Sequence, residues 1–252
     1  MLDVDARHPI SLCVSKEGDA RFMGQLDFLR LIERSLRRSG LPVQYTQGFN
    51  PRIKLTFADA LPLGVASPGE WIRLTLNKDL PPDEIRARLE PALPESVGVV
   101  DIRRGSPPEE MPTVRYRLDL VSGEGSAADA LTALLTRKEF HVKDPRRERT
   151  VDVRAFLRGG CLDGEGLDPH LLVDLVAVDG RPPRPGLLAE ALGQLSQEAG
   201  GAPPGFGMFT KLAAVERRQG AETWPEDAVA VTQEQQVVAS CSSTQVSPMK
   251  VG

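Results

Sequence analysis

The chain lacks the sequence motifs of several large protein classes. Its three cysteines, Cys13, Cys161 and Cys241, are far apart and form no Cys-x-x-Cys pair, which argues against a zinc ribbon or an iron–sulfur cluster. It contains no Gly-x-Gly-x-x-Gly, no Walker loop and no Gly-x-Ser-x-Gly, and aromatic residues make up only 5% of it. We therefore predict no metal site, no cofactor and no broad aromatic stacking platform.

Long apolar runs and an excess of one charge are also missing. No stretch reaches the about 18 apolar residues that a membrane-spanning helix needs, and Met1–His8 is too polar for a signal peptide. Few cysteines without a disulfide pattern suit a reducing compartment. We therefore predict a cytoplasmic protein with no membrane association. The net charge is −4, so any surface that attracts a polyanion must be local.

Strand-like and helix-like patterns alternate along the first half of the chain. The helix at Gln25–Ser39 is followed by Gly40 and Pro42, which are typical residues just beyond a helix end. The remaining predicted elements are strands at Ile10–Val14, Val43–Thr46, Ile53–Phe57, Trp71–Leu76 and Val97–Ile102, and a helix that begins at Pro82. The order is strand, helix, strands, strand, helix, strand.

A Pro/Glu-rich bridge at Gly105–Pro112 separates this half from a second one with the same order. Its predicted elements are strands at Val114–Leu120, Phe140–Val142, Thr150–Leu157, Leu171–Val178 and Met208–Val215, and helices at Ala127–Arg137 and Leu187–Leu195. The repeated order predicts an α+β fold of two tandem ferredoxin-like (β-α-β-β-α-β) sandwiches. We expect domains at residues 8–104 and 113–216, and a disordered polar tail at residues 217–252.

Basic residues gather on one face of the first predicted helix. Residues 28–57 contain six basic side chains and one acid, Glu33, a local net of +5. Arg30, Arg34, Arg37 and Arg38 fall within one third of the helix circumference, and Arg52 and Lys54 follow in the next turn and strand. Such a stripe is typical of a surface that contacts phosphates or an acidic partner. The charged outer face of an ordinary amphipathic helix would have the same pattern.

The turn after this helix adds polar and aromatic side chains. Tyr45, Gln47 and Phe49 surround Gly48, and an exposed Phe49 beside arginines could stack on a base. The alternative is that Phe49 folds back into the core. We use the name basic surface for the nine candidate binding residues, Arg30, Arg34, Arg37, Arg38, Tyr45, Gln47, Phe49, Arg52 and Lys54.

Two weaker features lie elsewhere. A second basic cluster falls in a predicted hairpin and is diluted by Asp144, Glu148 and Asp152, as on an ordinary soluble surface; it consists of Lys143, Arg146, Arg147, Arg149, Arg154 and Arg158. The three histidines, His8, His141 and His170, lack the spacing of a helical metal pair, and we expect each of them in a turn or at the surface.

Four segments carry a family resemblance, Val14–Arg30, Leu36–Pro42, Tyr45–Phe57 and Ala60–Val65. They resemble the radical-SAM-linked protein family, a bacterial family of unknown function, over roughly residues 8–215. The resemblance implies an accessory module that is often joined to, or encoded beside, a cobalamin-binding radical-SAM protein, and some members lie near ribonuclease E/G genes. The chain lacks the Cys-x-x-x-Cys-x-x-Cys of a radical-SAM enzyme, so the resemblance implies a partner more than a reaction.

Two departures from the family pattern bear on catalysis. The usual Ser-His-Leu-Asp is replaced by Gly24-Gln25-Leu26-Asp27, and Asn50 stands where Gly-Phe-His-Pro has histidine. A binding role survives both changes more easily than a catalytic one. The leading hypothesis is a non-catalytic, RNA-binding accessory module that works with a radical-SAM enzyme or RNA-processing machinery. The alternatives are an RNA-modifying or RNA-cleaving enzyme that uses Asp27, Tyr45 or a histidine, and a protein–protein adaptor for a radical-SAM partner.

Overall fold

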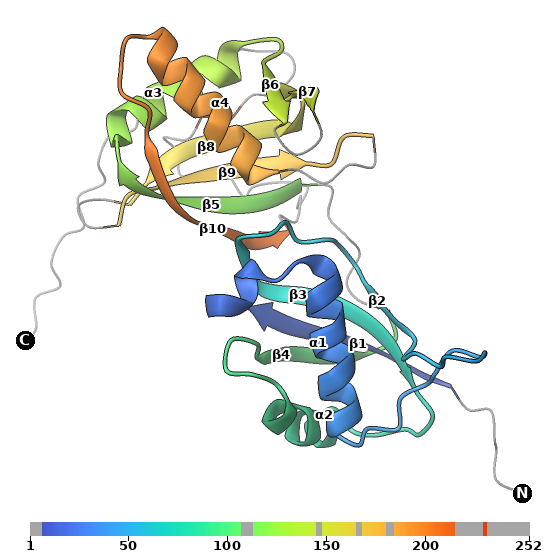
Figure 1. Cartoon of the computed structure of the whole chain (residues 1–252). Coiled ribbons are helices and arrows are strands. Elements are labelled where there is room, and N and C mark those ends of the chain that lie inside the picture. Colours follow the sequence, from blue (N-terminus) through green and yellow to red (C-terminus); the bar gives the residue numbers. More distant parts are fainter. Residues whose placement is uncertain are drawn as a thin grey trace, which may run out of the picture.

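The first half of the chain folds into a sheet with helices on one face. The computed structural model describes residues 7–106, 113–144, 148–164, 168–179, 184–214 and 229–230. The elements of the first half are β1 (His8–Lys16), η1 (Gly18–Phe22), α1 (Gln25–Arg38), β2 (Leu55–Phe57), β3 (Val65–Leu76), α2 (Pro82–Leu89), η2 (Glu90–Ala92) and β4 (Val99–Arg104). The strands pair antiparallel in the order β2-β3-β1-β4, and α1 and α2 cover one face (Figure 1).

The apolar stripe of α1 explains how this helix is held. Phe28, Ile32 and Leu36 are buried against β1 and β3, in a core that also contains Ile10 and Ile72. Burial of this face leaves the arginine-bearing side in solvent. The helix ends at Arg38 and is followed, after Ser39, by Gly40, whose φ of +64° is a left-handed conformation that glycine adopts without a steric penalty.

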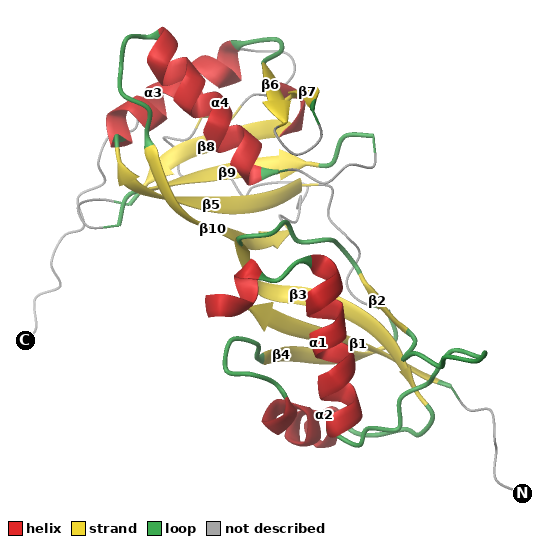
Figure 2. Cartoon of the chain, viewed as in Figure 1, coloured by secondary structure: helices red, strands yellow, loops and turns green. Residues whose placement is uncertain are grey.

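The second half repeats this arrangement of strands. Its elements are β5 (Thr113–Ser122), α3 (Glu124–Thr136), β6 (His141–Asp144), β7 (Arg149–Asp152), η3 (Arg154–Phe156), β8 (Leu157–Asp163), β9 (His170–Val176), α4 (Pro185–Glu198) and β10 (Gly205–Ala214). The strands of the main sheet pair antiparallel in the order β8-β9-β5-β10. When the β6–β7 hairpin is left out, β5, β8, β9 and β10 are the first to fourth strands, so the order is second, third, first, fourth, as in the first half. Figure 2 shows α3 and α4 together on one side of this sheet, while β6 and β7 form a separate hairpin.

The two halves are joined through their sheets. Phe209 and Thr210 of β10 pair in parallel with Val65 and Ala66 of β3, so that one nine-stranded sheet runs through both halves. Val65, from the first half, belongs to the hydrophobic core of the second half. The mixed α+β class predicted from the sequence is confirmed: the described residues form a large, mostly antiparallel sheet and four α-helices.

Three details of the predicted elements are wrong. The segment predicted as one strand at Thr150–Leu157 contains the end of β7 and the short helix η3, and the next strand, β8, begins at Leu157. Strand β8 was not predicted because it contains Gly159 and Gly160, and glycine is depleted in strands. The predicted strand at Val43–Thr46 forms only isolated bridges from Val43 and Tyr45. Glu33, expected on the exposed face of α1, is buried.

The proposed tail lies mostly outside the described residues. Within the predicted range 217–252, only Val229–Ala230 is described, and it forms β11, which pairs antiparallel with Gly159 and Gly160 of β8. The division into domains at 8–104 and 113–216 stays a prediction. No helix among the described residues is long and apolar enough to cross a membrane.

Candidate binding surface on the first half

The arginines of α1 point into solvent but differ in their contacts. Arg30 pairs with Asp27 at 3.3 Å from Nη1 to Oδ1, and both side chains are about two-thirds exposed. Arg38 donates to the carbonyl oxygen of Ala92 and, at 3.4 Å, to the hydroxyl of Ser35. These contacts hold Arg30 against its own helix and Arg38 against η2.

Four cations of the basic surface have no such partner. The side chains of Arg34, Arg37, Arg52 and Lys54 are exposed and make no hydrogen bond or ion pair with any residue that the structure describes. An exposed cation without an internal partner loses no existing interaction when it meets a phosphate. These four side chains are therefore the part of the basic surface best placed to bind an anion.

The turn after α1 presents its side chains outward. Its base is closed by backbone hydrogen bonds from Thr46 to Arg52 at 2.7 Å and from Lys54 to Gln44 at 2.9 Å. Gly48 has a φ of +129°, which favours glycine strongly. Phe49 is fully exposed at 106%, so it does not fold back into the core; Tyr45 is 39% exposed and Gln47 is exposed.

An open hollow of about 700 Å³ lies between α1 and this turn. Arg52 and Lys54 line it from the turn, Glu33 from α1 and Arg73 from β3. From α1 the hollow is lined by Leu29 and Glu33, so Arg52 and Lys54 are the residues of the basic surface that line it, and the arginines of α1 are not. Arg73 was missed in the sequence because it alternates with apolar residues in a strand, where it reads as an ordinary solvent-facing position. Only the sheet register shows that it lies opposite Thr56 of β2.

Comparisons with known proteins place the chain in a family. Residues 10–179 match the family described as "Uncharacterized protein conserved in bacteria (DUF2344)". The chain belongs to this family. The match covers all four segments that carry the resemblance noted in the sequence. None of the curated proteins matches this DUF2344 chain.

Two solved structures are similar to this DUF2344 chain at a low level. An unknown protein from Galdieria sulphuraria is 17% identical, with 77% of this chain and 95% of that chain covered and a TM-score of 0.25. A putative glycine cleavage system transcriptional repressor is 10% identical, with 82% and 99% covered and a TM-score of 0.20. Likenesses of this size carry no argument about function.

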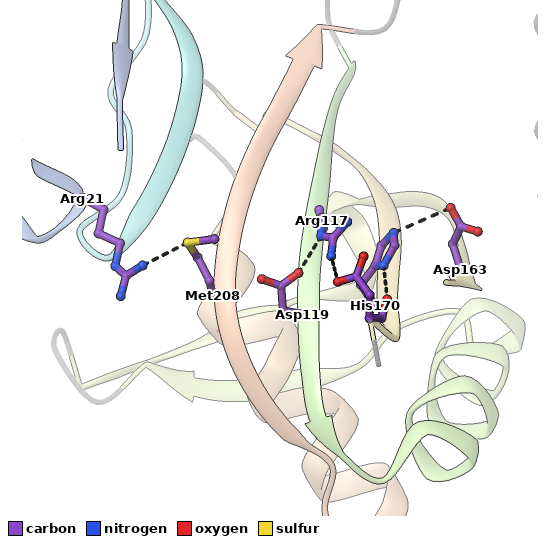
Figure 3. A network of polar contacts seen from close by, with 7 residues as sticks. Arg21, Arg117, Asp119, Asp163, His170 and Met208 are labelled. Carbon is purple, nitrogen blue, oxygen red and sulfur yellow. Dashed lines mark hydrogen bonds and ion pairs between the residues drawn. The ribbon is translucent and has the colours of Figure 1, made fainter. Parts of the chain in front are cut away.

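The residues considered for acid–base chemistry do not come together in this DUF2344 chain. Asp27 is exposed and paired with Arg30, on a different element from Tyr45. His170 was expected at the surface, but it is buried at the start of β9. Its Nδ1 lies 2.8 Å from the carbonyl oxygen of Asp168 and its Nε2 lies 3.6 Å from a carboxylate oxygen of Asp163 (Figure 3).

The surroundings of His170 are an ion-pair network of the second sheet. Arg117 of β5 bonds to Asp119 at 2.6 Å and also to Asp168 (Figure 3). Met208 of β10 and Arg21 of the first half contact each other at 3.0 Å in the same region. Each of the charged groups in this network is matched by another group of the protein, as in a structural network.

The described cysteines also lack the features of an activated nucleophile. Burial, together with the charges of Glu70 and Asp101, raises the pKa of Cys13 to about 11, so its thiol is protonated at neutral pH. Cys161 is buried as well. Among the described residues, no group of three or more His, Cys, Asp or Glu side chains is arranged to hold a metal ion.

Proposed function

We propose that this protein is a non-catalytic, RNA-binding accessory module that works with a radical-SAM enzyme or with RNA-processing machinery. The observation that carries the proposal is a set of four exposed cations without a partner among the described residues, Arg34, Arg37, Arg52 and Lys54, together with the fully exposed ring of Phe49 in the turn that precedes Arg52. Cations contact phosphates and release counterions, and an exposed ring stacks on an unpaired base. A single-stranded segment or loop of RNA offers both groups.

The arrangement of the scaffold supports a binding role. The two halves have the same strand order, and we propose that they are tandem ferredoxin-like sandwiches. The cations lie on a helix and on a turn closed by backbone hydrogen bonds, which limits the entropy that binding would cost. The partnership with a radical-SAM protein rests on the family resemblance and needs its own test.

RNA binding is tested by removing two unpaired charges. We expect the double substitution Arg34→Gln/Arg37→Gln to weaken binding of a fluorescent single-stranded RNA, measured by anisotropy over a range of salt concentrations. Each lost phosphate contact should reduce the slope of log K against log salt by about 0.7. The melting temperature should hardly change, because exposed charges contribute at most about 1 kcal/mol.

A matched control removes the same charge elsewhere. Lys78 and Lys138 are exposed and lie outside the basic surface, so Lys78→Gln/Lys138→Gln should leave the salt slope close to that of the parent. Equal affinity of the Arg34→Gln/Arg37→Gln variant and the parent at every salt concentration would show that this surface does not bind RNA.

A protein partner is the second candidate, and exposed apolar side chains favour it. Phe22 in η1 is 59% exposed and Leu26 at the start of α1 is 69% exposed. If a radical-SAM protein of the native cell is the partner, it should co-purify with the chain whether or not nuclease is added. The double substitution Phe22→Ser/Leu26→Ser should abolish its recovery. Recovery that depends on intact RNA would instead support the RNA-binding proposal.

A further inference from the structure

A closed-in cavity lies in the second half, away from the basic surface. Its volume is about 310 Å³, at the lower end of the range of about 300–1,000 Å³ that is common for small-molecule sites. It lies between β7, η3, the end of β9 and the first turn of α4. Figure 1 labels β7, β9 and α4 in the second half. Most of its wall is apolar and includes Val151, Phe156, Leu175, Val178, Leu187 and Leu188.

One cationic side chain on this wall lacks a partner among the residues that the structure describes. Arg149 is the first residue of β7, on the same strand face as Val151, and it lines the cavity. Its Nε is buried and has no hydrogen-bond acceptor among the described residues. A buried donor without an acceptor is costly, more so on a charged group, and buried donors in native proteins nearly always have an acceptor. The cavity is where an acceptor for Arg149 could be placed.

The other charged side chains that line the cavity either have partners within the protein or lie in solvent. Arg184, the residue before α4, is paired with the buried carboxylate of Asp144. Asp152 accepts hydrogen bonds from the backbone N–H groups of Phe140 at 3.0 Å and Arg154 at 3.1 Å. Asp179 is exposed, so water screens its charge. Asp144 is also the cross-strand neighbour of Arg149, but its carboxylate is paired with Arg184, and Arg149 makes no ion pair with any residue that the structure describes.

We propose that this cavity binds a small apolar molecule that carries a carboxylate, with the carboxylate on Arg149 and the apolar part against Phe156, Leu175 and Leu188. The planar fork of a guanidinium binds a carboxylate through two parallel hydrogen bonds. The site shares no residue with the basic surface, so it can be occupied whether or not RNA is bound.

Octanoate is a suitable probe, because it combines a carboxylate with a short apolar chain. We expect isothermal titration of the full chain to detect octanoate, and to give much weaker binding for octanol, which has no charge, and for octylammonium, which has the opposite charge. Arg149→Met should weaken octanoate binding by about tenfold or more, as expected for the loss of a charge-assisted pair. Arg149→Lys should recover only part of it.

Two further variants keep the test decisive. Lys143→Met makes the same change of charge on the exposed side of the same hairpin and should bind octanoate like the parent. Ala155→Leu adds bulk to the cavity wall and should weaken octanoate and octanol alike. Without ligand, Arg149→Met should melt no lower than the parent, because Arg149 has no counter-charge to lose.

Three results would overturn the proposal. These are absence of octanoate binding to the parent chain, equal binding by the parent and Arg149→Met, and a large loss of stability in ligand-free Arg149→Met. The last would show that Arg149 has a structural partner.

Discussion

Phe28 and Phe49 show two opposite uses of the same side chain within one short segment. Phe28 is 1% exposed and its ring lies 5.5 Å from that of Phe57, whereas Phe49 is fully exposed. Phe49→Ala should therefore reduce RNA affinity by about 1–3 kcal/mol while the melting temperature stays unchanged. Phe28→Ala should instead destabilise the fold by about 3–5 kcal/mol. A melting curve and an RNA titration of each variant check both; a large drop in the stability of Phe49→Ala would contradict the stacking role.

Tyr116 provides a prediction about alkaline pH. Burial, with the negative charges of Asp59 and Glu70, raises the pKa of Tyr116 far above its ordinary value of about 10. Above pH about 10 the unfolded chain releases the phenol proton of Tyr116, whereas the folded protein keeps it. The free energy of unfolding should therefore fall as the pH rises above about 10. Since the chain has two tyrosines, a Tyr45→Phe variant isolates Tyr116 in an ultraviolet titration. We expect its phenol to ionise together with unfolding; ionisation in the folded protein near pH 10 would show that the burial is wrong.

At the scale of elements, the sequence predicts those whose pattern is strong and local. The bounds of α1 were close because the apolar stripe of Phe28, Ile32 and Leu36 marks its buried face and Gly40 follows its end. The burial of Glu33 was missed because it depends on the 46–56 segment, which packs beside α1 from a distance in the sequence. The same holds for the position of Arg149, whose environment is made by η3, β9 and α4. Local periodicity cannot report contacts of this kind.

The missed strand β8 leads to a prediction of its own. A Cβ at Gly160 would lie 3.0 Å from Leu131 Cδ2, from the carbonyl oxygen of Leu172 and from Val173 Cγ1. Gly160→Ala should therefore cost about 1–3 kcal/mol, because helix α3 and strand β9 must move apart. Gly125→Ala is the control: a Cβ there meets nothing within 4 Å, and Ala is favoured over Gly in the helix α3. Denaturant unfolding checks both, and equal stability of Gly160→Ala and the parent would exclude a tight packing of α3 on β8.

At the scale of the whole molecule, buried charges lie where the halves meet. Lys211 of β10 pairs with Glu70 of β3 at 3.0 Å and with Asp59 at 3.5 Å, and Glu70 is 3% exposed. Lys16 is fully buried nearby, where it donates to the carbonyl oxygen of Met23 at 2.9 Å. Burial lowers the pKa of Lys16, and Glu70 partly offsets that shift. Glu70 therefore pairs with the half-buried ammonium group of Lys211 from the second half, and its negative charge favours the charged form of Lys16.

This arrangement predicts an asymmetry between the two partners. Glu70→Gln leaves Lys211 with Asp59, whereas Lys211→Met leaves the buried carboxylate of Glu70 without its ion-pair partner. Breaking a buried pair costs about 3–5 kcal/mol, and we expect Lys211→Met to reach this range and Glu70→Gln to cost less. The double substitution should cost less than the sum of the two single ones, because one variant removes a group that the other leaves unpaired. Guanidinium chloride unfolding of the four proteins measures all of these differences. Additive losses would show that Glu70 and Lys211 do not link the halves electrostatically, leaving the parallel pairing of β3 with β10 and the packing of Val65 to hold them together.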